Sequence, residues 1–329
     1  MNETYYLGAD VGSVSTNLVL INEHGSICHK LYLKTGGHPV ETLKNGLREL
    51  AGRACGSASI KAVGATGSGR QLAGLLIGAD VVKNEITAHS VAAYSVEPRV
   101  RTILEIGGQD SKIIFLKNGV VCDFAMNTVC AAGTGSFLDR QAARLEIPIE
   151  AFGSYALRAR NPVRIAGRCA VFAESDMIHK QQTGHCKEDI IAGLCEALVR
   201  NYLNNLAKGK QIEAPILFQG GVAANVGIVA AFEKILNQRL IVPRYYDVMG
   251  AYGAAILARE EMETSGRESR FCGFHGIEED LSINSMECKD CPNMCEIIRI
   301  SSGGRAMACW GDRCGKWSAA SAVKAGSRT

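Results

Sequence analysis

Two acidic residues stand at the ends of short apolar runs, and a glycine turn follows each of them. Asp10 precedes the turn at residues 11–13, and Glu105 precedes the turn at residues 106–110. A third glycine turn, at residues 220–225, follows another apolar run. Glycine turns expose backbone N–H groups that bind phosphate, and acids at strand ends hold Mg²⁺, usually through water. These residue types at these places predict a nucleotide site with Mg²⁺.

A fourth glycine-rich segment, residues 64–71, has the glycine spacing of a Walker A loop. It lacks the Lys and the Ser or Thr that such a loop uses to bind phosphate and Mg²⁺. Arg70 could still contact a phosphate. We nevertheless interpret this segment as a different kind of loop.

The elements that must position the first acid follow one another closely in the chain. Residues 5–10 are predicted to form a short apolar strand that ends at Asp10. Residues 16–22 and 27–34 are predicted to form a hairpin, and residues 40–54 carry apolar side chains at helical spacing. The order is therefore strand, glycine turn, hairpin and helix.

The same series of elements occurs again around the second acid. Residues 102–106 predict a strand, residues 111–116 and 120–126 a hairpin, and residues 131–145 a helix. The two series are offset by about 95 residues, which indicates an approximate duplication. We therefore expect an α/β protein with two similar halves.

Length and composition exclude several classes of protein. A chain of 329 residues allows about two domains, and 47% hydrophobic with 21% charged residues is typical of a globular protein. The 36 basic and 33 acidic residues are mixed along the chain, so the net charge of +3 does not indicate nucleic acid as a partner. The uncharged stretch 214–232 contains Pro215, Gly220 and Asn225, so we reject it as a membrane span.

The start of the chain and the number of cysteines indicate the compartment. The first eight residues show neither the basic segment nor the long apolar segment of a signal peptide. Thirteen cysteines in 329 residues fall below the density of a disulfide scaffold. We expect a cytoplasmic protein in a reducing compartment, where thiols are metal ligands or free groups rather than disulfides.

Two isolated cysteines lie where a thiolate is favoured. Cys130 directly precedes the second predicted helix, whose first turn contains Gly133 and Gly135. A helix N-terminus stabilises a thiolate, and each glycine costs about 1 kcal/mol of helix propensity, which suggests close approach by another group. Cys169 follows Arg168, whose cation also favours a thiolate. Taken singly, each cysteine also fits an inert, buried thiol.

A second group of cysteines lies near the C-terminus. Short Cys-x2-Cys spacing lets two sulfurs meet one metal, and further thiols can complete four ligands. The spacing predicts a zinc or iron–sulfur site, with fortuitous reduced cysteines as the alternative. The candidate ligands are Cys288, Cys291, Cys295, Cys309 and Cys314, with Cys272 upstream.

The glycine turns resemble the phosphate and adenosine motifs of the superfamily of acetate and sugar kinases, heat-shock chaperone ATPases and actin (the ASKHA fold). The closer resemblance is to the activators of 2-hydroxyacyl-CoA dehydratases and the ATPase subunits of benzoyl-CoA reductases. It covers about residues 4–260, and the segments around Cys130 and Cys169 make it specific. The segments that show it are GADVGSVST at 8–16, EIGGQDSK at 105–112, NTVCAAGTG at 127–135, GRCAVF at 167–172 and GGVAAN at 220–225.

This resemblance implies a duplicated ASKHA fold of two subdomains, each with a mixed sheet flanked by helices, and a nucleotide cleft between them. It implies that Asp10 and Glu105 organise Mg²⁺ and water. Gln109 is then the implied contact to the γ-phosphate or its water, with Asp110 as a rival. The implied contacts to ATP or ADP are Gly12, Ser13, Val14, Ser15, Thr16, Gly107, Gly108, Gly133, Gly135, Gly220, Gly221, Val222 and Asn225.

The resemblance also implies a [4Fe–4S] cluster that bridges a homodimer, with Cys130 and Cys169 of each chain as its ligands. Two thiolates from each of two chains make the four that such a cluster needs. The implied activity is an ATPase that takes single electrons from ferredoxin or flavodoxin. It would pass them at low potential to an iron–sulfur enzyme such as a 2-hydroxyacyl-CoA dehydratase or benzoyl-CoA reductase, and the identity of that enzyme stays open.

Other classes of function also stay open. A small-molecule kinase on the same fold would need an acceptor pocket and a base, for which Asp110 or Glu85 could serve, and it would not need Cys130 or Cys169. A nucleotide-gated chaperone would need a substrate-binding domain, and the residues after 265 are few and rich in cysteine. In a further alternative, the C-terminal cysteines form a zinc module that only binds a partner.

These patterns predict three parts of the chain. Residues 1–97 form the first subdomain, and residues 98–265 form the second, with a returning helix at residues 249–258. Residues 266–329 form a small Cys-rich extension, which ends in a small, polar tail at residues 318–329. The activators that the chain resembles end near the start of this extension, so the role of the extension is left open.

Overall fold

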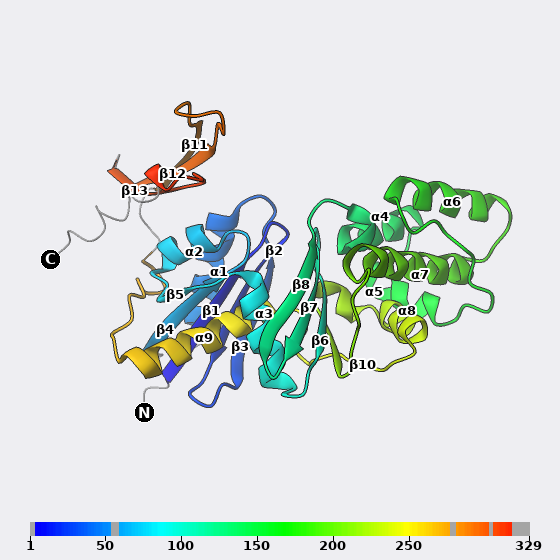
Figure 1. The fold of residues 1–329 in the computed structure, drawn as a ribbon, viewed down its shortest axis with the longest axis horizontal. Coiled ribbons are helices and arrows are strands. Elements are labelled where there is room, and N and C mark those ends of the chain that lie inside the picture. The colour runs from blue at the N-terminus through cyan, green and yellow to red at the C-terminus, as the bar shows by residue number, and fades with distance from the viewer. Residues whose placement is uncertain (1–3, 54–58, 277–280, 303–304, 318–329) are drawn as a thin grey trace.

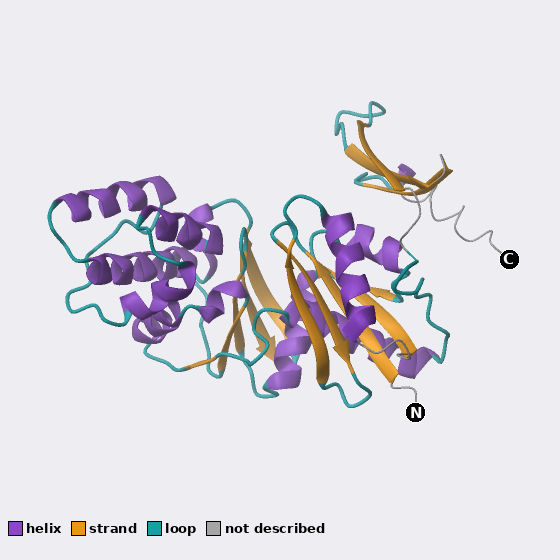
Figure 2. Ribbon diagram, turned by 180° about the vertical axis from the view of Figure 1, so that it is seen from behind, coloured by secondary structure: helices purple, strands orange, loops and turns teal. Residues whose placement is uncertain are grey.

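The computed structural model describes residues 4–53, 59–276, 281–302 and 305–317 (Figure 1). Two five-stranded sheets lie side by side with helices between them, and a small three-stranded sheet follows near the C-terminus. The view from behind shows the same layers, with further helices on the outer faces of both large sheets (Figure 2). The predicted α/β class is confirmed.

The first half contains a mixed sheet with the strand order β3-β2-β1-β4-β5. The three strands β1 to β3 are antiparallel neighbours, whereas β4 runs parallel to β1 and β5 parallel to β4. The predicted hairpin and helix of this half are confirmed, and residue 54, the last of the predicted helix, lies outside the described residues. The elements are β1 (Thr4–Val11), β2 (Ser15–Ile21), β3 (Ile27–Lys34), α1 (Pro39–Arg53), β4 (Ser59–Thr66), α2 (Arg70–Ile77) and β5 (Val81–Val82).

The second half repeats this topology with the strand order β10-β9-β6-β7-β8. Here β6 to β8 are antiparallel neighbours, and β9 runs parallel to β6. The predicted duplication is therefore confirmed, because each strand of the first sheet has its counterpart at the same place in the second. The strands are β6 (Thr102–Ile106), β7 (Ser111–Lys117), β8 (Val120–Asn127), β9 (Ile216–Gln219) and β10 (Leu240–Ile241).

The two halves differ in the helices that cover their outer faces. Helices α1 and α2 cover the first sheet, with Leu43, Leu47 and Leu50 of α1 fully buried against it. The second sheet carries a larger helical layer, whose core includes the edge-to-face rings of Tyr202 and Phe232. That layer consists of α4 (Gly135–Arg144), α5 (Ile149–Ala156), α6 (Ala170–Gln182), α7 (Lys187–Leu206) and α8 (Val226–Leu236).

Helices α3 (Glu85–Val96) and α9 (Met249–Ser265) lie between the two sheets (Figure 1). Their small residues let them approach each other and the strands closely. A Cβ on Gly253 of α9 would lie 1.8 Å from the Ala88 carbonyl oxygen of α3, and a Cβ on Gly8 of β1 would lie 1.8 Å from the Ala251 carbonyl oxygen. The returning helix α9 extends to Ser265 and is therefore longer than the predicted 249–258. Together with α3 it forms a layer that contacts both halves.

One predicted helix is wrong in its continuity. Instead of a single helix over residues 131–145, a three-residue 3₁₀ turn, η1 (Ala131–Gly133), precedes α4, and Thr134 between them is extended with φ −131°. The first N–H groups of α4 are bound by the turn after β6: Gly135 and Ser136 each donate to a turn carbonyl at 2.9 Å. Helical spacing alone cannot show this interruption, because its cause is a hydrogen bond to a distant strand end.

The chain after α9 first packs along the first half. Arg270 donates its backbone N–H to Asp80 at 2.8 Å, and the rings of Phe271 and Phe274 pack against the core of that half. An antiparallel sheet follows, with the order β11-β12-β13, formed by β11 (Leu281–Glu287), β12 (Glu296–Ser302) and β13 (Arg305–Trp310). The predicted tail at residues 318–329 lies outside the described residues, and the predicted domain boundaries stay predictions. No described helix is long and apolar enough to cross a bilayer.

Candidate active site

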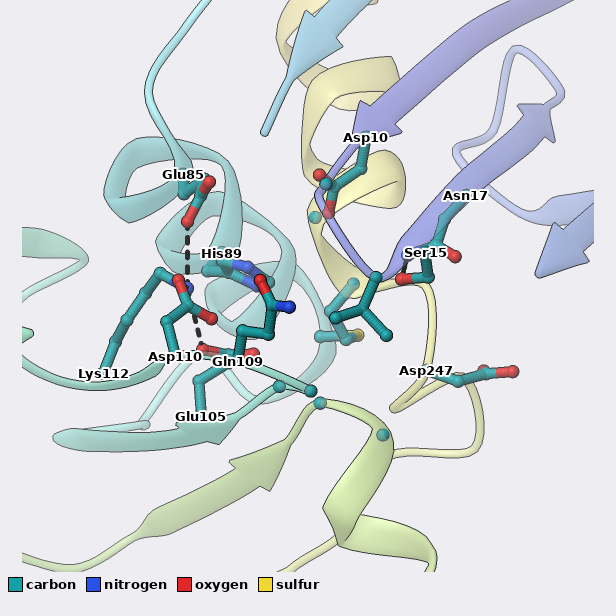
Figure 3. A pocket seen from close by; sticks show the side chains of 18 of the residues that line it. Asp10, Ser15, Asn17, Glu85, His89, Glu105, Gln109, Asp110, Lys112 and Asp247 are labelled. Atoms are coloured by element: carbon teal, nitrogen blue, oxygen red, sulfur yellow. Dashed lines mark hydrogen bonds and ion pairs between the residues drawn. The ribbon is translucent and has the colours of Figure 1, made fainter. Parts of the chain in front are cut away.

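A polar cavity of about 270 Å³ opens where the carboxyl ends of β1 and β6 meet (Figure 3). Since these strands belong to different halves, the cavity lies between the halves, as the duplicated topology requires. It brings together most of the predicted nucleotide and Mg²⁺ residues. Those that line it are Asp10, Gly12, Ser13, Val14, Ser15, Glu105, Gly107, Gly108, Gln109, Asp110, Gly220 and Gly221.

Asp10 ends β1 with a half-buried carboxylate. Glycines make room for it on two sides, because a Cβ on Gly67 would lie 2.6 Å from one carboxylate oxygen and a Cβ on Gly250 would lie 2.1 Å from the other. Among the described residues, no cation lies within ion-pair distance of this carboxylate. Burial, followed by the nearby charge of Glu85, raises the pKa of Asp10 to about 7. The carboxylate of Asp10 could therefore bind an added cation.

Glu105, the matching acid at the end of β6, is buried and paired. Its carboxylate lies 3.1 Å from Nζ of Lys112, which also contacts Asp110 at 2.7 Å and Glu85 at 2.9 Å. Figure 3 shows these side chains converging on the ammonium from the β6–β7 turn and from the start of α3. Burial raises the pKa of Glu105 to about 8, despite the opposing charge of Lys112.

Lys112 is absent from the predicted site residues, although it ends the EIGGQDSK segment. Its side chain is only 3% exposed. Burial acts to lower the pKa of Lys112, but the carboxylates of Glu105, Asp110 and Glu85 outweigh it and raise that pKa well above its usual value. The ammonium is therefore charged at all ordinary pH values, and although burial acts to raise the pKa of Glu85, Lys112 lowers it.

A second polar pair joins His89, which lines the cavity, to a buried residue behind it. Nε2 of Gln219, at the end of β9, lies 2.8 Å from Nδ1 of His89 on α3. Burial, together with the Lys112 charge, lowers the pKa of His89 to about 3, so the imidazole is neutral. This contact links the second sheet to the helix layer directly below the two acids.

The two phosphate turns touch each other across the cavity. Oγ of Ser13 donates to Oε1 of Gln109 at 2.7 Å. A Cβ on Gly108 would lie 2.7 Å from the side chain of Val14, so glycine is what allows the turns to meet. The contact joins the first half of the chain to the second at the cavity.

Five predicted nucleotide contacts do not line the cavity. Thr16 instead pairs its hydroxyl with that of Thr35 at 3.0 Å, and the Asn225 side chain caps α8. The two glycines near Cys130 leave room for protein atoms, since a Cβ on Gly133 would lie 2.8 Å from Oδ1 of Asn201. These residues have packing and capping roles here, and their contacts to nucleotide stay predictions. The five are Thr16, Gly133, Gly135, Val222 and Asn225.

Other lining residues had no signal in the sequence. Tyr32 of β3 and Asp247, which precedes α9, line the mouth beside Gly221. Asp247 forms an ion pair with Lys30 at 2.7 Å, which joins β3 to the chain segment before α9. The loop with Walker A spacing lies near Asp10 through its Gly67, and Arg70 donates to the Gly67 carbonyl at 3.1 Å.

Asn201 of α7 links Cys130 to the segment that leads into Cys169. Its Nδ2 lies 3.8 Å from Sγ of Cys130 and donates to the carbonyl of Gly167 at 2.6 Å, two residues before Cys169. Asn127 holds the backbone of Cys130 from both sides, at 2.8 Å in each case. Both thiols are partly exposed.

The structure places the N-terminus of a full helix at Cys169, whereas the sequence predicts it at Cys130. Cys130 precedes only the three-residue η1, whereas Cys169 is the N-cap residue of the 13-residue helix α6. The positive end of a full helix therefore lies at Cys169 and not at Cys130. Large apolar side chains beside both cysteines face solvent: Val129 is 95% exposed, Val171 69% and Phe172 66%.

The fold and cavity define the class of this protein. A ROK family glucokinase from Streptomyces griseus, solved with glucose and AMPPNP, superimposes with a TM-score of 0.52 at 14% identity, over 78% of this chain and 99% of that one. At that identity the likeness shows the fold alone. Two duplicated mixed sheets around one polar cavity are thus the predicted ASKHA fold.

The particular family follows from the sequence. The pattern of the BadF/BadG/BcrA/BcrD ATPase family matches residues 7–258, and the chain belongs to this family. The predicted ATPase is confirmed. The matched residues end before β11, so they do not include the small C-terminal sheet.

Two named relatives and one solved structure are similar to most of this chain. The chain is 34% identical to the 2-hydroxyisocaproyl-CoA dehydratase activator of Clostridioides difficile, over 80% of this chain and 98% of that protein. It is 33% identical to the (R)-2-hydroxyglutaryl-CoA dehydratase activating ATPase of Acidaminococcus fermentans, over 77% of this chain and 96% of that protein. The structure of the Clostridium difficile activator with bound ADPNP superimposes with a TM-score of 0.74, over 80% of this chain and 97% of that one.

Proposed function

We propose that this ATPase is an electron-transfer activator that works as a homodimer around a shared [4Fe–4S] cluster. ATP hydrolysis would drive single electrons, at low potential, to an iron–sulfur partner of the 2-hydroxyacyl-CoA dehydratase class. The observation that carries the proposal is the placement of the two cysteines: Asn201 joins Cys130 to the segment just before Cys169, in a chain whose relatives are named as dehydratase activators.

The nucleotide half of the proposal rests on the cavity. Asp10, without a cation of its own, and Glu105 would hold Mg²⁺ through water, while the glycine turns bind the phosphates. Gln109 and Asp110, which line the same cavity, would orient the γ-phosphate and its water. Hydrolysis needs little more than this, because phosphoryl transfer is catalysed mainly by positioning and by charge stabilisation.

The cysteine pair fits a shared cluster in ligand type and number. Each chain offers two partly exposed thiols at this surface. A cluster with four thiolate ligands therefore needs a second copy of the pair. When bound, such a cluster accepts and releases one electron at a time. Cys169 also lies at the positive, N-terminal end of helix α6.

The surroundings of the cysteines support a second copy of this chain as the partner at this surface. Val129, Val171 and Phe172 are large, apolar and mostly exposed, directly beside the two thiols. Clustered apolar side chains on a surface mark contacts with other proteins. In a symmetric dimer, each chain would cover the apolar side chains of the other.

The coupling between ATP and the electron has a required size. Raising one electron by ~300 mV takes about 7 kcal/mol, since ~59 mV corresponds to a factor of ten for one electron. The two conformations of the dimer must therefore differ in nucleotide affinity by that order. The contact between Ser13 and Gln109 is the place where a γ-phosphate would first act on both halves.

The donor and the acceptor are proposed by analogy to the relatives. Reduced ferredoxin or flavodoxin would supply the electron, and a 2-hydroxyacyl-CoA dehydratase, benzoyl-CoA reductase or related cluster protein would receive it. One of the benzoyl-CoA reductase subunits of Thauera aromatica is 27% identical over 77% of this chain and 91% of that protein. This lower identity favours the dehydratase class.

A kinase on the same fold is less well supported. Its two candidate bases, Asp110 and Glu85, are both ion-paired to Lys112, at 2.7 and 2.9 Å. Glu85 is a poor proton acceptor: although burial acts to raise the pKa of Glu85, Lys112 lowers it and so favours the ionised form. The named relatives above are activators, and the kinases among the solved structures share only the fold.

The proposal is tested by counting the iron atoms that each dimer binds. Protein purified without oxygen should contain four irons and four labile sulfides per dimer, with a broad visible absorption that bleaches on reduction. Cys169→Ser should remove this iron and weaken the dimer, because symmetry removes two of the four ligands. Cys186→Ser, at another exposed cysteine, is the matched control and should keep both. A Cys169→Ser protein that retains its iron would contradict the proposal, as would strict dependence of ATP turnover on a sugar or carboxylate acceptor.

A further inference from the structure

The end of the small C-terminal sheet gathers cysteines from two separate segments. The pairing of β11 with β12 ends at Glu287 opposite Glu296, and the N–H of Cys288 then donates to the carbonyl of Cys295 at 2.8 Å. Cys288 and Cys295 therefore face each other where the hairpin loop begins. Residues that face each other in this way have Cβ atoms about 5 Å apart, and Cys291 lies in the loop between them.

The chain returns to this same end after β13. Because β13 runs antiparallel to β12, it finishes beside the start of β12, and a Cβ on Gly311 would lie 2.2 Å from the Glu296 carbonyl oxygen. The next residues then close over the hairpin loop: Nε1 of Trp317 donates to Sγ of Cys288 at 3.4 Å. Cys314 lies in this closing segment and thus belongs to the same end of the sheet.

A cation accompanies the thiols. Lys316 forms an ion pair with Asp290 in the hairpin loop and lies within electrostatic range of both Cys288 and Cys314. Four thiolates around a divalent ion leave a net charge of −2. The ammonium of Lys316 and the N–H of Trp317 are the kind of surroundings that stabilise such a charge, as partners of metal ligands commonly do.

Two other cysteines are excluded by their positions. Cys309 pairs with Arg299, four residues along β12 from Cys295, which is about 13 Å at the rise of a strand. A zinc–sulfur bond is only about 2.3 Å long. Cys272 donates its N–H to the Ile77 carbonyl at the end of α2, so it packs on the first half. The five candidates of the sequence thus reduce to four.

We propose that Cys288, Cys291, Cys295 and Cys314 bind one Zn²⁺ ion with tetrahedral geometry. Four Zn–S bonds form, and the four thiols release their protons to solvent. Among the described residues no three such side chains already form a ligating group, so binding would draw together sulfurs that the sheet holds at one end. The proposal goes beyond the activator function, which uses Cys130 and Cys169.

Zinc suits this part of the chain better than a redox centre. The sheet has three short strands and a small core, in which Ile297 and Ile300 are fully buried. Small modules with little apolar core commonly need a metal or a disulfide for stability. A closed set of four thiolates from two chain segments is a structural zinc site, since it leaves no open position on the ion.

The experiment uses the full chain, with metals counted per protomer. Wild-type protein should contain one zinc in addition to any iron, and replacement by Co²⁺ should give the visible spectrum of a tetrahedral thiolate site. Cys291→Ser and Cys314→Ser, at exposed residues, should each lose the zinc. Cys309→Ser and Cys272→Ser are the matched controls and should each keep one zinc per chain.

Each remaining outcome counts against the proposal. Zinc absent from the wild type, or retained in both Cys291→Ser and Cys314→Ser, would overturn the site. Loss of zinc from Cys309→Ser would overturn the ligand set, and iron with labile sulfide at these cysteines would overturn the choice of metal. ATP hydrolysis, measured in the same samples, reports whether residues 4–265 are folded. Zinc and the dimer's iron are counted separately, so failure of one proposal is distinguishable from failure of the other.

Discussion

The two turns that follow β1 and β6 share a topology but not an electrostatic environment. Asp10 lies between two glycines, without a cation at ion-pair distance among the described residues. Glu105 is 4% exposed and is held by Lys112. A duplication copies the backbone of a turn, whereas the side chains packed around each copy decide how its acid is charged. Asp10 could therefore bind an added cation, whereas Glu105 is already paired with Lys112.

This asymmetry also predicts which kind of ligand the cavity would bind. One ammonium faces four carboxylates, those of Asp10, Glu85, Glu105 and Asp110. Like charges gathered in a buried cavity repel one another, so a divalent cation is favoured there. The two acids therefore respond differently to mutation, and the following changes separate them.

The largest effect is expected at the acid without a cation. Asp10→Asn should lower the rate of ATP hydrolysis by about 10³-fold, because it removes the charge that would organise Mg²⁺ at the phosphates. ADP binding in the absence of metal should change little, since the amide has the same shape, and the melting temperature should not fall. Steady-state phosphate release with saturating Mg²⁺ measures the rate. A variant within tenfold of the wild type would place Mg²⁺ on the Glu105 side of the cavity.

The second largest effect is expected when Glu105 and its neighbouring carboxylates lose the ammonium of Lys112. Lys112→Met leaves three carboxylates without their cation, and breaking a buried ion pair in this way costs about 3–5 kcal/mol. Lys112→Arg keeps the charge and should recover a large part of that free energy of unfolding. Denaturant unfolding in EDTA measures both variants.

Mg²⁺ provides the control for this interpretation. Added Mg²⁺ should stabilise Lys112→Met more than it stabilises the wild type, since the ion replaces the lost ammonium. Equal stabilisation of the two proteins would mean that Lys112 contributes by packing rather than by charge.

The sequence could indicate Asp10 and Glu105 because both signals are local. An acid at a strand end followed by glycines is visible within five residues, and it recurs in the duplicated half. Lys112 is different, because its role depends on Glu85 at the start of α3, which only tertiary packing brings to 2.9 Å. A lysine on a strand has no pattern of its own that marks it as buried.

The cysteine region shows the same limit. Residues 131–145 have helical spacing, yet Thr134 is extended because the N–H groups after it bind the turn that follows β6. The predicted helix dipole at Cys130 was wrong for this reason. Cys169 has the longer helix, and its only local sign was the preceding Arg168. At the C-terminus, spacing alone could not remove Cys309, because its exclusion follows from strand register.

A smaller effect is expected from pH. The pKa of Asp10 is raised to about 7 in the folded protein, so between about pH 4 and pH 7 the folded state binds more protons than the unfolded state. Stability without metal should therefore fall as the pH rises through that range. A rise in pKa from about 4 to about 7 corresponds to about 4 kcal/mol, and the partial exposure of the side chain reduces this value. Asp10→Asn removes this loss and should be more stable than the wild type by about 2–4 kcal/mol near pH 8, and equally stable near pH 4.

Unfolding by urea at the two pH values, in EDTA, measures this difference. The corresponding replacement on the paired side, Glu105→Gln, should behave differently, because it also removes a partner of Lys112. A stability gain in Glu105→Gln as large as that in Asp10→Asn would mean that the two acids are electrostatically alike.

The smallest effect is expected at the contact between the two turns. Ser13→Ala removes the hydrogen bond to Gln109, a contact worth about 0.5–1.5 kcal/mol. We expect a γ-phosphate to replace this contact, so the variant should bind a non-hydrolysable ATP analogue as well as the wild type or up to about tenfold more tightly, while ADP affinity stays the same. A double-mutant cycle with Gln109→Ala isolates the pair, and its coupling energy should be about 1 kcal/mol in the nucleotide-free protein and smaller with the ATP analogue bound. A coupling that grows on binding the analogue would show that the hydrogen bond belongs to the ATP-bound state. In that case the two turns close on the nucleotide rather than open for it.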